Sequence, residues 1–103
     1  MKKYQLVLQF RATSIEDFDR LIAFESILLD GLPPLGEVDG HDFGKDEFNI
    51  FVLTDTPVEA FDAAELLRRK ELSECSPVVA YRELLAEDYI VLSPKGYEGF
   101  TIS

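Results

Sequence analysis

The sequence predicts a single α+β domain in which two helices lie on one face of an antiparallel sheet. Short apolar stretches alternate with two longer stretches of helical periodicity, in the order strand, helix, strand, strand, helix, strand. The chain has 103 residues, of which 47% are hydrophobic, so it can build one core of its own. No linker or repeat divides it, and we therefore treat residues 1–103 as one domain.

Local signals place the first strand and the first helix. Apolar side chains at every second position predict a strand over 4–10 with one face in the core. Thr13 and Ser14 each have an acidic residue three positions later, and either hydroxyl can cap a helix. Apolar residues from Ile15 to Leu29 then recur at helical spacing. Gly31 ends this helix, and the two prolines beyond it prevent continuation.

The middle of the chain predicts a hairpin and a second helix. The second strand, 35–43, is the weaker one because glycines interrupt it and carboxylates lie along it. A turn at 44–46 leads into a third strand, 48–53, which is apolar on nearly both faces. The segment 56–59 begins a helix with a capping hydroxyl, a proline and a glutamate. The basic run 68–70 complements the negative end of that helix.

A fourth strand is predicted at 78–81, and two further short strands at 89–92 and 100–102. The first six elements have the order of a ferredoxin-like sandwich (βαββαβ), here with extra C-terminal strands. In that arrangement strands one and three are central and strand two lies at an edge. Glycines and carboxylates are typical of a protected edge. The extra strands would extend the sheet or pair with a second subunit, so a homodimer is one expectation.

The net charge of −10 arises in one part of the chain. Thirteen of the twenty carboxylates lie within 13–62, where only Arg20 and Lys45 oppose them. Elsewhere seven acidic residues face eight basic ones. A one-sided acidic field repels nucleic acid and anionic membranes, and it attracts basic proteins or divalent cations. The composition therefore predicts a protein that binds neither nucleic acid nor membrane.

The densest group of carboxylates is predicted to dock a basic protein partner. These residues occupy the second strand and the turn after it: Glu37, Asp39, Asp42, Asp46 and Glu47. They would steer and hold lysines and arginines, joined by Asp17 and Asp19 if the first helix lies nearby. The first functional hypothesis is therefore a non-enzymatic binding protein. A solvated edge strand without function is the alternative interpretation of the same residues.

His41 suggests a different function. On a regular strand Asp39 and His41 would share a face, with Glu37 beside them. Such a trio could hold a divalent cation or act as a carboxylate–imidazole general base. The second hypothesis is thus a small dimeric ligand-binding domain or enzyme that uses His41 with Asp39 or Asp42. An exposed histidine on a solvated hairpin is the simpler alternative, and the sequence favours no catalytic residue, no metal and no cofactor.

Other functional classes find little support in the sequence. Cys75 is the only cysteine and follows Glu74, whose carboxylate disfavours a nucleophilic thiolate. One thiol builds neither an internal disulfide nor an iron–sulfur cluster. G-x-S-x-G, H-E-x-x-H and P-loop patterns do not occur. No apolar run approaches the length of a signal or a membrane span, so we expect a soluble cytoplasmic protein.

The segment that covers 38–44, 48–51 and 54–57 resembles a stretch found in small, uncharacterised bacterial α+β proteins. Some acidic proteins of this size and layout are immunity proteins, which neutralise a toxin made by the same or a rival cell. The resemblance covers about twenty residues and carries no catalytic signature. It implies a bacterial interaction protein with a toxin as its basic partner.

Overall fold

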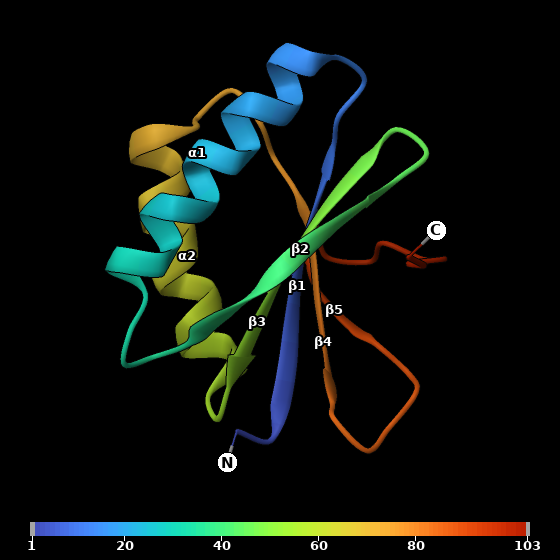
Figure 1. Cartoon of the computed structure of the whole chain (residues 1–103). Helices are drawn as coiled ribbons and strands as arrows, with labels where there is room; N and C mark the ends of the chain where they lie inside the picture. The colour runs from blue at the N-terminus through green and yellow to red at the C-terminus, as the bar shows by residue number, and fades with distance from the viewer. Residues whose placement is uncertain (1, 103) are drawn as a thin grey trace.

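The computed structural model describes residues 2–102 as one antiparallel sheet with two helices on one face (Figure 1). The strands are β1 (Tyr4–Arg11), β2 (Glu37–Gly44), β3 (Glu47–Thr54), β4 (Val78–Glu83) and β5 (Ile90–Ser93). The helices are α1 (Ile15–Gly31) and α2 (Pro57–Glu71). The strands are ordered β2-β3-β1-β4-β5, and every neighbouring pair is antiparallel. The predicted α+β class is confirmed.

The core lies between the helices and one face of the sheet. β1 is the central strand, and its Leu6, Leu8 and Phe10 are buried on this face. Phe24 of α1 meets the edge of the Phe10 ring at a centroid distance of 6.0 Å. Helix α2 buries small residues such as Ala60, which lets its backbone approach the sheet closely. Strands β1 and β3 thus supply most of the sheet's core residues, and β2 and β5 form the two edges of the sheet.

The other face of the sheet is partly covered by the C-terminal segment of the chain. Val7, Asn49 and Ala80 lie on this face by register, and all three are fully buried. The segment after β5 returns to this side of the sheet, away from the helices (Figure 1). The Gln9 amide donates a 2.9 Å hydrogen bond to the Thr101 carbonyl, while the rings of Tyr89 and Phe100 meet at 5.0 Å. The C-terminal segment therefore covers part of the second face.

The C-terminal predictions are correct in part. The strand predicted at 89–92 is confirmed as β5, which pairs with β4 outside the first four strands. The strand predicted at 100–102 is wrong, because those residues join no ladder. Gly96 and Gly99 both take positive φ angles, so the chain that leads to 100–102 is bent rather than extended.

The start of α1 resolves which hydroxyl caps it. The Ser14 hydroxyl accepts a 3.1 Å hydrogen bond from the backbone N–H of Asp17. The Asp17 carboxylate in turn accepts a 3.0 Å bond from the backbone N–H of Thr13. This backbone hydrogen bond lowers the pKa of the Asp17 carboxyl below its ordinary value. Both polar groups of the predicted capping pattern are thus occupied.

One arginine holds the turn that follows α2. The buried Arg68 donates to the carbonyls of Leu72 and Cys75 at 3.4 and 2.7 Å, and its Nε donates to Glu65 at 2.8 Å. The hydrogen bonds that Arg68 donates to the Glu65 carboxylate raise the pKa of the guanidinium above its ordinary value. Arg68 therefore binds two carbonyls of the turn that follows the helix, one of which, that of Leu72, also accepts from the Cys75 N–H.

A second arginine holds the turn that follows β4. Arg82 Nη1 donates to the carbonyls of Glu83, Leu84 and Ala86 at 3.3, 3.0 and 3.0 Å. Its Nε donates to Gln5 at 3.1 Å. The loop between β4 and β5 is thereby tied to β1. Among residues 2–102, no helix is long and apolar enough to cross a membrane.

Candidate functional site

The carboxylates predicted to dock a partner all lie on the β2–β3 hairpin, at the edge of the sheet. Glu47 is half-buried, and the other four are exposed: Glu37, Asp39, Asp42 and Asp46. They do not form one continuous row. Asp42 and Glu47 face away from the helices by register, whereas Asp46 lies at the tip of the hairpin with a positive φ angle.

Amide side chains hold two of these carboxylates in place. The Asn49 amide donates 3.0 Å hydrogen bonds to both Asp42 and Glu47. Gln9 donates to Glu47 at 3.2 Å and to the Asn49 oxygen at 3.0 Å. Asn49 is fully buried, so its position between the two carboxylates is fixed. The donors offset the repulsion between like charges and orient both groups before any partner arrives.

A recess of about 320 Å³ lies between the start of α1 and the β2–β3 hairpin. We call it the acidic recess, and its lining residues are Ala12, Thr13, Ser14, Ile15, Phe18, Phe43, Asp46 and Glu47. Two large apolar side chains are exposed here, Ile15 at 80% and Phe43 at 63%. The Phe18 ring supports Phe43 edge-on at 5.0 Å. An exposed apolar surface thus lies beside Asp46, whereas the Glu47 carboxylate points to the opposite face of the sheet, where Gln9 and Asn49 bind it.

The sequence did not single out the apolar part of this recess. Ile15 belongs to the helical pattern that predicted the buried face of α1, yet it is the first residue of the helix and lies beyond the core. Phe43 follows the inward alternation of β2, but the edge of the sheet leaves its outer side uncovered. Their positions could have indicated this exposure, because Ile15 directly follows the cap of α1 and Phe43 directly precedes the turn of the hairpin.

The two aspartates of α1 have different surroundings. Asp17 takes part in the helix cap, where one oxygen of its carboxylate accepts from Thr13. Asp19 is exposed on α1. Arg20, one of the two cations of the acidic stretch, forms a 3.2 Å ion pair with Glu74 instead of with the hairpin. Arg20 therefore does not neutralise the carboxylates of the hairpin.

His41 contacts Glu25 of α1 and none of its expected partners. Its Nδ1 is 2.9 Å from Glu25 Oε1, and its ring stacks on Phe48 at a centroid distance of 4.9 Å. The side chain is 29% exposed. His41 pairs with Ile50 on the helix side of the sheet, whereas Asp42 pairs with Asn49 on the opposite side.

The expected grouping of Glu37, Asp39 and His41 on one face is wrong. A β-bulge interrupts β2 between Val38 and Gly40, and Gly40 has a φ angle of 122°. The extra residue reverses the alternation of side chains, so Glu37 and His41 point to opposite faces. Within residues 2–102, no group of three or more His, Cys, Asp or Glu side chains has the arrangement to hold a metal ion. The acidic recess is not lined by His41.

Comparison of the chain with protein-family models, with curated proteins and with solved structures finds no match. Function is therefore inferred from the residues of this chain alone. The feature with the clearest chemistry is the acidic recess with the carboxylates of the hairpin beside it.

Proposed function

We propose that this protein is a non-enzymatic interaction protein that docks a basic protein on the acidic recess and the β2–β3 hairpin. The observation that carries the proposal is the exposure of Ile15 and Phe43 beside Asp46, at the tip of the acidic β2–β3 hairpin. Protein interfaces depend on a few apolar anchors surrounded by a polar rim. The complementary surface would present an apolar side chain flanked by lysines or arginines.

The charge of the protein supports fast association with such a partner. The net charge of −10 attracts a basic surface from a distance, and steering of this kind raises association rates by ~10–10³-fold. The hydrogen bonds from Asn49 hold Asp42 and Glu47 in position before docking. Less side-chain freedom is then lost on binding, which favours affinity. Added salt would screen the steering and slow association.

A toxin is the partner that we propose, so that the chain would act as an immunity protein in the cytoplasm. The small size, the acidity and the resemblance over 38–57 support this assignment. The first six elements also support a ferredoxin-like arrangement, since β1 and β3 are central, β2 is at an edge and β4 lies beside β1. β5 then extends that sheet by one strand.

Two other expectations have weaker support. A ligand-binding domain or enzyme that uses His41 with Asp39 or Asp42 is not proposed, because His41 contacts Glu25 and lies on the opposite face from Asp42. Homodimerisation through an edge of the sheet stays a prediction. Light scattering tests it, and a strict monomer would rule it out.

Selection from a displayed peptide library tests the proposed docking site. With the full chain immobilised, we expect enriched peptides to combine an apolar residue with neighbouring lysines or arginines. Phe43→Ser should weaken their binding by roughly 30-fold, as for a hot-spot residue of about 2 kcal/mol. Leu66→Ser is the matched control, since Leu66 is equally exposed on α2 but does not line the recess.

Three results would contradict the proposal. One is enrichment of neutral or acidic peptides. Another is equal loss of binding in Phe43→Ser and Leu66→Ser, which would place the contact elsewhere. The third is an association rate that does not respond to salt, because the carboxylates would then contribute no steering.

A further inference from the structure

The Phe43 ring gives the acidic recess an open aromatic surface. The Phe43 side chain is 63% exposed, and the Phe18 ring contacts it at a centroid distance of 5.0 Å with the two planes at 88°. Phe18 in turn contacts the buried Phe48 at 5.3 Å, so the core holds it in place. Phe43 is thus supported by one ring and still open to solvent. The face of such a ring is negative and attracts cations.

A carboxylate without a partner lies at the same recess. Asp46 is one of the lining residues, and its side chain forms no hydrogen bond or ion pair with any other residue in 2–102. Its backbone carbonyl accepts a 3.1 Å hydrogen bond from the Ala12 N–H. The backbone of Asp46 is therefore held while its carboxylate stays available to a ligand.

The charges around the recess are mainly negative. Glu16 and Asp17 stand in the first turn of α1, where they offset the positive end of that helix. Lys45 is the only lysine or arginine of the β2–β3 hairpin, and it does not line the recess. Arg11 pairs with Glu47 by register and points to the opposite face of the sheet. A cation that enters the recess therefore meets carboxylates.

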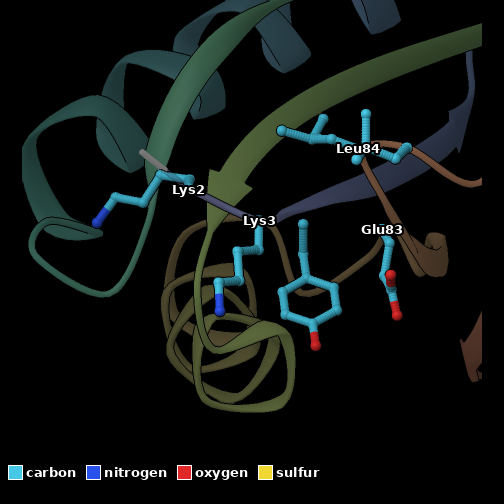
Figure 2. A pocket seen from close by; sticks show the side chains of 6 residues that line it. Lys2, Lys3, Glu83 and Leu84 are labelled. Atoms are coloured by element: carbon cyan, nitrogen blue, oxygen red, sulfur yellow. The ribbon is translucent and has the colours of Figure 1, made fainter.

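A larger recess at the opposite end of the sheet has no such preference for one charge (Figure 2). Its volume is about 580 Å³, and it is lined by residues 2–4 and 83–85. Figure 2 shows Lys3 and Glu83 on its two sides, with Lys2 extending away from them. Lys2 lies 3.9 Å from Asp55, and the loop after β4 carries two further carboxylates. Positive and negative groups balance there, so only the acidic recess selects a charge.

We propose that the acidic recess binds an arginine side chain of the partner, with its guanidinium stacked on Phe43 and hydrogen-bonded to the Asp46 carboxylate. This inference rests on the proposed docking function and names the basic residue that the recess selects. Arginine fits better than lysine, because its planar group stacks on an aromatic face and donates two parallel N–H groups to a carboxylate. The methylene stem packs against Ile15. A volume of about 320 Å³ suits one such side chain.

Two short peptides that differ only in their basic residues test this selection. The probes are acetyl-Leu-Arg-Leu-Arg-amide and acetyl-Leu-Lys-Leu-Lys-amide, each titrated into the labelled full chain and followed by NMR. We expect both to shift the amide signals of Ile15, Phe43 and Asp46. The arginine peptide should bind roughly fivefold more tightly, which is the effect of one cation–π contact at an exposed site.

Substitution of the ring separates stacking from simple apolar contact. Phe43→Leu keeps an apolar side chain but removes the aromatic face, so the preference for arginine should disappear. Phe43→Trp should keep or enlarge the preference, because Trp offers the strongest face to a cation. Tyr97→Leu is the matched control, since Tyr97 is also an exposed aromatic residue but does not line the recess. Both positions lie outside the core, so the variants should keep the spectrum of the folded chain.

The outcomes separate this inference from the docking function. Equal affinities of the two peptides, with shifts at the recess, would overturn the selection of arginine and leave the docking of a basic partner standing. A preference that survives in Phe43→Leu, or that is lost equally in Tyr97→Leu, would overturn the selection as well. No shift at the recess with either peptide would contradict both the selection and the docking function.

Discussion

The two ends of the sheet differ in charge but are built in a similar way. The acidic end holds the β2–β3 hairpin, the start of α1 and the end of α2, whereas the opposite end holds the start of β1 and the β4–β5 loop (Figure 1). At that opposite end Lys2, Lys3 and Arg82 are balanced by three carboxylates, Glu83, Glu87 and Asp88. At each end one arginine binds the carbonyls of a turn, Arg68 at the acidic end and Arg82 at the opposite end. The geometry of both turns therefore depends on an arginine, so the exposed residues of each turn can differ in charge without changing its shape.

The largest effect is expected where the acidic end depends on amide donors. Asn49→Asp places a third carboxyl between Asp42 and Glu47 at a fully buried position. We expect a loss of roughly 4 kcal/mol in the free energy of unfolding at neutral pH, measured by urea denaturation. The loss should shrink in acid, because protonation of the introduced carboxyl removes the repulsion. A variant that is as stable as the parent at neutral pH would show that the donors are dispensable.

The two arginines allow a direct comparison of the ends. Arg68→Met should lower the free energy of unfolding by about 3 kcal/mol, because it removes the buried guanidinium from Glu65 and leaves the Cys75 carbonyl without its donor. Arg82→Met should cost about 1 kcal/mol, since Arg82 is only half-buried and water can replace it. Denaturation of both variants under identical conditions measures the difference. Equal losses would mean that burial does not separate the two ends.

The smallest effect concerns the cap of α1. The folded pKa of Asp17 lies below its ordinary value of 3.8, so the carboxylate adds stability above that value. This contribution is lost as pH falls through the folded pKa. Asp17→Asn should therefore be less stable than the parent at neutral pH, with the gap closing below 3.8. Thermal unfolding at several pH values measures the gap, and a gap that does not change with pH would contradict the assignment.

Much of the fold could be predicted because its signals are local. Alternation marked β1, the proline and glutamate marked the start of α2, and glycine with carboxylates marked β2 as an edge. The strand expected at 100–102 failed for a tertiary reason. Its polar groups are used across the sheet face, where the Thr101 carbonyl accepts from Gln9, instead of in a ladder.

The candidate sites were harder to predict because they join distant residues. The hairpin carboxylates were visible in the sequence, but Ile15 and Phe43 become one recess only when α1 and β2 meet. The contact of His41 with Glu25 likewise joins β2 to α1. The recess lined by residues 2–4 and 83–85 brings the first residues of the chain to the loop after β4, about eighty positions away, with no motif in either segment.

The bulge in β2 has a consequence for the behaviour of many copies together. Fibril growth needs a straight free edge on which identical strands can stack in register. Here the extra residue at Asp39 shifts the hydrogen-bonding register of β2, so the two halves of this edge strand do not match one continuous partner strand. Carboxylates lie along both halves. A second copy that pairs with one half is out of step with the other and meets like charge. The edge is therefore a poor template, which favours solubility at high concentration.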